Sequence, residues 1–404
     1  MNKKNIAFFI YDLRCGGIEK SLIDLMKKLD YDRYEIDLIM FSEQGQFLEE
    51  VPTEVNIIHY KLENFVSIHI DGHIKKSLIF LLKHRKIGEF IKCLYLLCVE
   101  RIFYNKKRWE YVCNRFVKKS SALPKHYDVA IDYQGLGSSI LGLPMVAEKI
   151  KSNIKLTWIH QDINYISCES KKFAYYIREF DKVFCVSSSA KDAFLTEFPE
   201  YADKTDVLYN VIDKEKIIIK SEEHIDFKFE KDSLNILSVG RLDHQKGYDI
   251  ALRSLARIKD EIPKFVYTIV GGGETILREL QDLANELGIK ENVIFAGRQD
   301  NPYPFYRNTD IYIQPSRFEG FCITLAEAKF FGKPIITTDF AGAREQIVNM
   351  ETGIITKCVE NDLADALVEL ISSKELQEKF TQNLKNVRQL ECELNKLYNI
   401  FDLS

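Results

Sequence analysis

The sequence predicts an α/β protein of two doubly wound domains, each built on a parallel sheet. Short apolar runs of strand length alternate with longer amphipathic segments, and this alternation is typical of parallel sheets. The alternation stops in a charged stretch at 213–233 and then starts again. The chain has 404 residues, and at about 100 to 200 residues per domain this length suggests two domains. We expect a ligand site in a cleft between them.

The first half begins with an apolar run at 6–11, followed by Gly16-Gly17 and a helical pattern at 18–29. Further runs of strand length follow at 35–41, 55–60, 129–133, 154–159, 183–186 and 206–209. These elements predict a first domain over 1–210.

The second half repeats the alternation. Its expected strands are 234–239, 265–270, 293–295, 311–314, 334–338 and 353–355. Its expected helices are 248–258, 276–287, 322–331 and a C-terminal one at 374–401. We therefore predict a second domain over 211–385, followed by a C-terminal helix at 386–404 that is long enough to cross back to the first domain.

Composition excludes several classes of protein. Hydrophobic residues make up 46% of the chain, and 56 Lys and Arg face 60 Asp and Glu, so the chain is neither disordered nor collagen-like. No apolar run approaches the roughly 20 residues of a membrane span, and the run at 6–11 is too short for a signal peptide. The nine cysteines include no C-x-x-C pair, which predicts reduced thiols in a cytoplasmic protein and no zinc site.

Positive charge is concentrated in a predicted helical insertion at about 74–125. This insertion has 14 Lys and Arg against Glu89, Glu100 and Glu110, a net +11, which leaves −15 for the other 352 residues. Apolar and aromatic residues lie among these cations, as in amphipathic helices on anionic membranes. We expect this insertion to lie on an anionic membrane surface, with a solvated helical insertion as the alternative. Nucleic acid is not expected as a partner, because the rest of the chain is acidic and no recognition module is visible.

Ligands of open parallel sheets bind beyond the carboxyl ends of the strands, and two loops in that position could hold an anion. Gly16-Gly17 precede a helix whose N-terminal amides are free to bind one, although a structural turn is an equal alternative. Gly240-Arg241 follow a strand, and Lys246 precedes the next helix. Two cations beside backbone amides suit a diphosphate better than a monoanion.

Two more motifs follow strands of the second domain. The segment 271–274 has three glycines but lacks the last glycine of the dinucleotide fingerprint, which favours a tight turn. Further on, Glu319 and Glu327 lie eight positions apart at the start of a predicted helix, where both could face one cleft. Carboxylates accept hydrogen bonds from sugar hydroxyls, and free amides at 321–323 could hold phosphate. Taken alone, the pair could equally be two unrelated surface acids.

The motif of Gly240, Arg241 and Lys246 and the later motif of Glu319 and Glu327, in this order and spacing, resemble those of the retaining nucleotide-sugar glycosyltransferases of family 4. These enzymes build bacterial surface polysaccharides and have the GT-B fold, two Rossmann-like domains facing across a cleft. The resemblance is strongest over 234–347 and extends more weakly to nearly the whole chain. The matching segments are Gly16–Glu19, Trp158–Asp162, Val186-Ser187, Tyr209–Asp213, Ser238–Arg241, Val270–Glu274, Phe295–Gly297 and Glu319–Glu327.

The resemblance implies a role for each matching residue. Arg241 and Lys246 would neutralise the donor diphosphate, Glu327 would hold the ribose hydroxyls, and Glu319 would contact the donor sugar. His160, at the end of an apolar strand, would lie beside the transferred sugar. The implied catalytic residues are therefore His160, Glu319, Arg241 and Lys246.

The donor site implied in the same way extends over both domains. Gly297 and Arg298 would lie near the nucleobase, while Gly16 and Gly17 would approach the phosphate and the acceptor. The complete set of implied donor-binding residues is Gly16, Gly17, Gly240, Arg241, Lys246, Gly297, Arg298, Glu319, Gly320, Phe321, Cys322, Ile323 and Glu327.

The implied reaction moves a sugar, with retained anomeric configuration, from a nucleotide-diphosphate donor, expected to be a UDP-sugar, to a saccharide acceptor. The acceptor is expected to be polyprenyl-linked at the inner face of the plasma membrane, as in capsule synthesis. No metal or other cofactor is expected, and the D-x-D at 30–32 predicts a turn. Two alternatives stay open: a nucleotide-sugar epimerase or phosphorylase on the same architecture, and a non-catalytic partner subunit.

Overall fold

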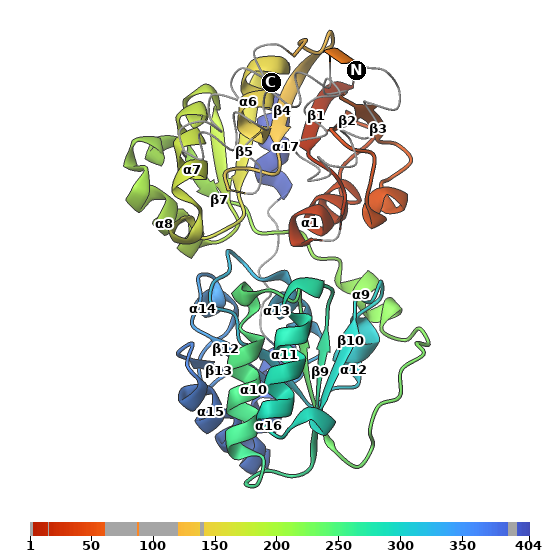
Figure 1. The fold of residues 1–404 in the computed structure, drawn as a ribbon. Helices are drawn as coiled ribbons and strands as arrows, with labels where there is room; N and C mark the ends of the chain where they lie inside the picture. The colour runs from red at the N-terminus through yellow and green to blue at the C-terminus, as the bar shows by residue number, and fades with distance from the viewer. Residues whose placement is uncertain (1–2, 15, 61–86, 89–119, 138–140, 387–393) are drawn as a thin grey trace. The chain divides into compact units, whose positions relative to one another are not determined.

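The structure is a computed structural model that describes residues 3–14, 16–60, 87–88, 120–137, 141–386 and 394–404 (Figure 1). The chain divides into two compact units. The first unit comprises Met1–Cys185, Leu195–Asp206 and Leu394–Ser404, and the second comprises Val186–Phe194 and Val207–Glu393. Most of the basic insertion predicted at 74–125 lies outside the described residues.

The first unit is built on a seven-stranded sheet with the strand order β3-β2-β1-β4-β5-β6-β7. Neighbouring strands from β3 to β6 pair in parallel. The strands are β1 (Lys4–Ile10), β2 (Tyr34–Met40), β3 (Asn56–His59), β4 (His126–Asp132), β5 (Lys151–Ile159), β6 (Lys182–Cys185) and β7 (Thr205–Val207). The described α-helices of the first unit are α1 (Gly17–Met26), α6 (Gly142–Lys149), α7 (Cys168–Lys171) and the C-terminal α17 (Leu394–Leu403). Helix α8 (Ser188–Glu197) is divided between the two units.

The second unit is built on a six-stranded sheet with the order β10-β9-β8-β11-β12-β13, and all its pairings are parallel. Its strands are β8 (Leu234–Val239), β9 (Phe265–Val270), β10 (Val293–Gly297), β11 (Ile311–Gln314), β12 (Ile335–Thr338) and β13 (Ile354–Thr356). Its helices are α9 (Lys214–Lys220), α10 (Tyr248–Ile258), α11 (Glu274–Glu286), α12 (Tyr303–Arg307), α13 (Ile323–Phe330), α14 (Ala343–Gln346), α15 (Glu360–Ser372) and α16 (Lys374–Asn386). These two sheets confirm the predicted fold class of two parallel-sheet, Rossmann-like domains.

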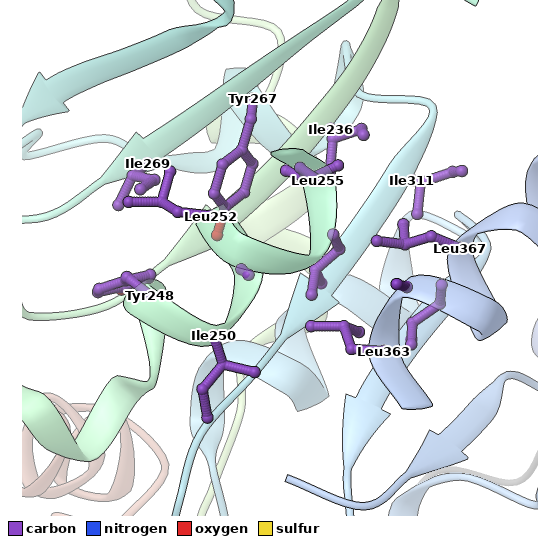
Figure 2. Packing of buried hydrophobic residues seen from close by; sticks show 14 of the residues in the cluster. Ile236, Tyr248, Ile250, Leu252, Leu255, Tyr267, Ile269, Ile311, Leu363 and Leu367 are labelled. Carbon is purple, nitrogen blue, oxygen red and sulfur yellow. The ribbon is translucent and has the colours of Figure 1, made fainter. Parts of the chain in front are cut away.

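The second sheet is buried on both faces, which explains why its strands are continuous apolar runs. On β8, Ile236 packs into one cluster and its neighbour Leu237 into the other. Helices α10, α11 and α15 cover the face that contains Ile236, where Leu252 and Leu367 meet strand residues (Figure 2). Helices α9, α12 and α13 contribute to the opposite cluster. Because side chains alternate along a strand, a one-residue shift would exchange the two clusters.

Four of the described helices of the second unit were not predicted: α9, α12, α14 and α15. The charged stretch at 213–233 contains α9, whose first turn is capped by the Asp213 carboxylate, which accepts a hydrogen bond from the Lys216 amide at 3.2 Å. Only Ile217 of this helix is buried, so no apolar period is visible in the sequence. Helix α15 packs against α10 and β13.

The predicted helix at 374–401 is helical at 374–386 and at 394–403, and these two parts belong to different units. In the first unit, the Tyr34 hydroxyl donates to the Asp402 carboxylate at 2.8 Å, and the Tyr34 ring packs edge-on against Phe401. These contacts attach α17 to β2.

Candidate active site

The candidate residues of the second unit lie in loops at its topological switch point. The strand order reverses between β8 and β11, and a crevice at the carboxyl ends of such strands is where parallel sheets bind ligands. Gly240, Arg241 and Lys246 follow β8, while Ser316 and Glu319 follow β11. The fold therefore brings the motif that contains Arg241 and Lys246 together with the motif that contains Glu319.

A buried ion pair joins these two loops. The Lys246 ammonium lies 2.6 Å from Glu319 Oε1, and the two side chains are 13% and 9% exposed. The Ser316 hydroxyl donates to the same oxygen at 2.8 Å, and the Gln245 amide donates to Oε2 at 3.3 Å. Burial alone would lower the pKa of Lys246, but the neighbouring Glu319 carboxylate outweighs it and the pKa is raised. Lys246 is therefore a fixed cation at physiological pH, with ammonium protons left for a ligand.

The turn that carries Lys246 is held from three directions. The Asp243 carboxylate accepts from the Lys246 amide at 3.2 Å. Arg317, from the loop after β11, donates to the His244 carbonyl at 2.7 Å and makes a bidentate pair with Asp249 at 2.7 and 2.8 Å. Bidentate guanidinium–carboxylate pairs fix geometry as well as adding energy. These contacts hold the turn that carries Lys246 against the loop after β11.

Arg241 differs from Lys246 in being exposed. Its side chain is 65% exposed and lies 3.2 Å from Asp243, so its guanidinium can turn toward a ligand. The preceding Gly240 has φ +156°, and its carbonyl accepts a hydrogen bond from the Tyr248 hydroxyl at 2.8 Å. A Cβ atom on Gly271 would lie 1.8 Å from the Gly240 carbonyl oxygen. This close approach explains why a glycine stands at 271. The segment 271–274 forms a turn against the loop after β8.

The residues expected near a nucleobase lie beside that turn. Gly297 ends β10 with φ +67°, at an irregularity of its pairing with β9, and its carbonyl accepts from the Gly271 amide at 2.9 Å. A Cβ atom on Gly272 would lie 3.2 Å from the Cβ of Arg298. The Arg298 side chain is about half exposed and lies 3.7 Å from Asp300.

Glu327 lies deeper than Glu319. It belongs to α13, is only 2% exposed, and accepts hydrogen bonds from the Tyr303 hydroxyl at 3.1 Å and the Tyr306 hydroxyl at 3.3 Å. Sequence reasoning missed both tyrosines, which stand eight and five residues before the start of β11 and are three residues apart, on one face of α12. The Tyr303 and Tyr306 hydroxyls therefore position the Glu327 carboxylate, and a ligand hydroxyl would have to reach it at this buried position.

The loop between the two glutamates enters α13 through an unusual residue. Cys322 has φ +68°, a left-handed conformation that disfavours side chains with a Cβ, and it is the N-cap of α13. Burial, reinforced by Glu319, raises the pKa of the Cys322 thiol to about 12, so the thiol stays protonated. The Gly320 carbonyl accepts from the Ser187 hydroxyl at 2.8 Å, and the Phe321 carbonyl accepts from the Gln346 amide. Ile323 then begins the helix.

In the first unit, His160 directly follows β5 and is held by the loop after β4. Its Nε2 lies 2.6 Å from the Tyr133 carbonyl oxygen. A carbonyl only accepts, so Nε2 carries the proton. Burial lowers the pKa of His160 to about 4, which leaves the ring neutral with Nδ1 as a hydrogen-bond acceptor. The Tyr133 hydroxyl also lies 3.0 Å from the Ser21 hydroxyl of α1, the helix that starts at Gly17 after Gly16.

Asp132, which sequence reasoning missed because it ends an apolar strand, lies beneath the same loop. Its carboxylate accepts from the Gly135 amide at 3.2 Å and from the Thr157 hydroxyl at 3.1 Å. Burial raises the pKa of Asp132 to about 7. The buried carboxyl therefore fixes the turn that holds His160.

Within the ranges that the structure describes, no three His, Cys, Asp or Glu side chains gather as a metal site would require. Over the same ranges, no helix has the length and apolar character of a membrane span.

Comparison with known proteins identifies the family. The family model of glycosyl transferases group 1 matches residues 219–387, which include β8 to α16. A Campylobacter jejuni protein named N-acetylgalactosamine-N,N'-diacetylbacillosaminyl-diphospho-undecaprenol 4-alpha-N-acetylgalactosaminyltransferase is 32% identical over 401 residues, covering 95% of this chain and 94% of that protein. The chain belongs to the group 1 glycosyl transferases.

Further comparisons agree with this glycosyltransferase assignment. A glycosyltransferase of Methanocaldococcus jannaschii is 25% identical over 255 residues, and the match covers 55% of this chain and 63% of that protein. Among solved structures, HepE of Anabaena in complex with UDP superposes with a TM-score of 0.65 at 17% identity, covering 99% and 98% of the two chains. This likeness confirms the GT-B fold of the glycosyltransferase.

Proposed function

We propose that this glycosyltransferase moves a hexose or hexosamine from a UDP-sugar to a saccharide carried on a polyprenyl diphosphate, with retention of anomeric configuration, in surface polysaccharide synthesis. The observation that carries the proposal is the buried Lys246–Glu319 pair at the switch point of the second sheet, beside the exposed Arg241. This arrangement offers a fixed cation, a mobile cation and a carboxylate within two neighbouring loops.

The charges match what the reaction needs. Breaking a sugar–phosphate bond leaves negative charge on the departing diphosphate, and preorganised cations stabilise that charge most effectively in a partly buried site. Lys246 and Arg241 would supply the cations, and the backbone amides at 321–323 would supply further donors. The reaction then needs no cofactor, and any metal dependence would be a separate finding.

Glu319 is better suited to binding than to attack. Its Oε1 already accepts from Lys246 and Ser316, and a carboxylate with its lone pairs engaged is a weak nucleophile. We assign it to a hydroxyl of the donor sugar, and assign departure of the diphosphate and attack of the acceptor to the same face of the sugar. Nδ1 of His160 would accept a hydrogen bond from another sugar hydroxyl.

The donor and acceptor are inferred from relatives. The Campylobacter jejuni relative, which matches nearly end to end, is named for transfer to an undecaprenyl diphosphate-linked saccharide. HepE was solved with UDP, although at 17% identity that likeness supports the fold rather than the ligand. The UDP-sugar donor is therefore proposed from the family resemblance of the sequence motifs, and the relative's name supports the acceptor.

The test measures sugar transfer and donor binding by the purified protein. We expect transfer to a polyprenyl diphosphate-linked saccharide from one of the UDP-, GDP-, ADP- and dTDP-sugars, and an α-linked product from an α-linked donor by NMR. A donor at 100 times its Kd adds about 2.7 kcal/mol of stability. Arg241→Gln should abolish most of the resulting thermal shift. Arg257→Gln, at the far end of α10 in the same unit, should not.

Other outcomes would overturn the proposal. An inverted product would exclude retention, and donor consumption without an acceptor would point to an epimerase or a phosphorylase. A protein that binds donor but transfers nothing to any saccharide would point to a non-catalytic partner subunit.

The membrane association is proposed from the sequence alone, since most of the basic stretch at 74–125 lies outside the described residues. Its net +11 charge would hold the enzyme on the anionic inner face of the plasma membrane, where a lipid-linked acceptor is available. Pelleting with anionic vesicles should weaken sharply when Lys75, Lys76, Lys83, Arg85 and Lys86 are neutralised. Unchanged pelleting would refute this association.

A further inference from the structure

A buried amide lies between the two glutamates of the second unit. Gln314, the last residue of β11, is 1% exposed. Its Oε1 accepts hydrogen bonds from the Tyr312 hydroxyl at 2.6 Å and the Thr324 hydroxyl at 3.1 Å. Its Nε2 donates to the Ser316 hydroxyl at 2.8 Å. The side chain thus contacts both β11 and the first turn of α13.

On one side the hydrogen bonds continue to Glu319. The Ser316 hydroxyl donates to Glu319 Oε1 at 2.8 Å, the oxygen that also binds Lys246. A hydroxyl has a single proton, so a Ser316 that donates to Glu319 must accept from Gln314. The Gln314 amide therefore fixes the direction of the Ser316 hydroxyl.

On the other side the contacts reach Glu327. Thr324 belongs to α13, as does Glu327, and its carbonyl lies 3.2 Å from the Tyr306 hydroxyl. The same hydroxyl lies 3.3 Å from Glu327 Oε2. Gln314 holds the first turn of this helix against the end of β11, and so holds the helix that carries Glu327.

We propose that Gln314 is a positioning residue of the donor site, which orients Glu319 toward the donor sugar and α13 with Glu327 toward the nucleoside. This inference rests on the proposed function, because it places a nucleotide-sugar at this site. It deepens that function by naming a residue that contacts neither ligand nor reacting atoms.

The hydrogen-bond pattern requires a neutral side chain with both a donor and an acceptor. A leucine would leave the buried hydroxyls of Tyr312, Ser316 and Thr324 without this partner, and buried polar groups without a partner are costly. A carboxylate could accept from Tyr312 and Thr324 but has no proton for Ser316. A protonated carboxyl, in contrast, has both an O–H donor and an acceptor oxygen and can replace the amide.

This difference gives a test by pH. We compare Gln314→Glu, Gln314→Leu and the wild type for the ratio of UDP-sugar affinity to UDP affinity and for kcat, between pH 6 and pH 8. As a control, Ser254→Ala removes another buried hydroxyl of the second unit, whose oxygen lies 2.8 and 2.9 Å from the Ile250 and Glu360 carbonyl oxygens.

We expect Gln314→Glu at pH 8 to lower the affinity ratio by about fivefold or more, which is the size expected for one lost buried hydrogen bond. The ratio and kcat should recover as the pH falls to 6, because burial beside Glu319 raises the pKa of the introduced carboxyl. Gln314→Leu should lower the ratio of UDP-sugar affinity to UDP affinity at pH 8, and the ratio should stay low at pH 6. Ser254→Ala should lose stability alone.

Two results would overturn the inference: a Gln314→Glu ratio at pH 8 equal to that of the wild type, or identical pH curves for the Glu and Leu variants. The wild type decides the proposed function separately. If it binds both ligands but transfers no sugar, the proposed function fails while the binding ratio still decides the role of Gln314. If it binds neither ligand, both fail.

Discussion

A Cβ atom on Gly247 would lie 2.0 Å from the carbonyl oxygen of Pro315. Gly247 stands directly after Lys246, and Pro315 directly after β11, so the two loops of the donor site meet here without a side chain between them. Gly247 also has φ +66°, a conformation that a Cβ disfavours. Two separate constraints therefore fix a glycine at the point where Lys246 approaches Glu319.

We predict that Gly247→Ala destabilises the second unit and displaces Lys246. The backbone conformation should cost about 1 kcal/mol, and the clash should add about 1 to 3 kcal/mol more. Gly288→Ala is a matched control, because Gly288 also has φ +66° but its Cβ would meet only the flexible end of Lys259, at 3.3 Å. Urea unfolding measures both variants. Equal losses of stability would show that the approach to Pro315 is not tight.

Cys322 gives the opposite prediction, that a glycine is tolerated well. Its φ of +68° strains any residue with a Cβ, while its buried side chain packs among the apolar residues around Leu325. Cys322→Ala should keep the strain and lose the sulfur contacts, whereas Cys322→Gly should relieve the strain. We therefore expect the Gly variant to be more stable than the Ala variant by about 1 kcal/mol, the reverse of the usual helix order. Thermal unfolding of the two variants side by side decides this, and an Ala variant that is the more stable one would contradict it.

The sequence predicts much of this fold because the second sheet is buried on two faces and its strands are continuous apolar runs. The resemblance implies that Lys246 and Glu319 both contact the donor. The structure brings them together because both follow parallel strands, whose carboxyl ends share one edge. Helix α9 could not be predicted in the same way. Its three consecutive isoleucines have no helical period, and Ile219 is exposed while Ile217 is buried.

The residues that position the site are harder to predict. Gln314 is a polar residue at the end of a strand, where a solvent-facing side chain is the usual expectation. Tyr303 and Tyr306 bind Glu327 from a helix that precedes β11, a contact that depends on how α12 packs on α13. Such contacts are set by tertiary packing, and no local pattern in the chain specifies them.

The buried carboxyl of Asp132 predicts a pH dependence of stability. Its folded pKa of about 7 lies above the usual Asp value of 3.8, so the folded state holds a proton that the unfolded state releases between these pH values. Its contribution to stability is then full below pH 3.8 and is lost as the pH rises through 7. The shift corresponds to at most about 4 kcal/mol.

Asp132→Asn keeps an acceptor for the Gly135 amide but cannot ionise. We expect the stability of the variant relative to the wild type to increase between pH 5 and pH 8, as measured by urea unfolding at each pH. A difference that stays constant over this range would mean that Asp132 is ionised throughout.

His160 gives a prediction that can be read without any assay of activity. Its Nε2 donates to the Tyr133 carbonyl, and burial lowers its pKa to about 4, below the usual His value of 6.5. The unfolded state therefore binds a proton that the folded state refuses, so the contribution of His160 to stability is present above pH 6.5 and is lost as the pH falls toward 4. In ¹⁵N NMR spectra we expect the neutral Nε2–H tautomer of His160 from pH 8 down to about pH 5. Asp132→Asn should keep this tautomer, since its turn retains the Gly135 hydrogen bond. In the wild type, a His160 ring that titrates near pH 6.5 would refute the burial of His160. It would also refute the assignment of His160 as a neutral acceptor for a sugar hydroxyl.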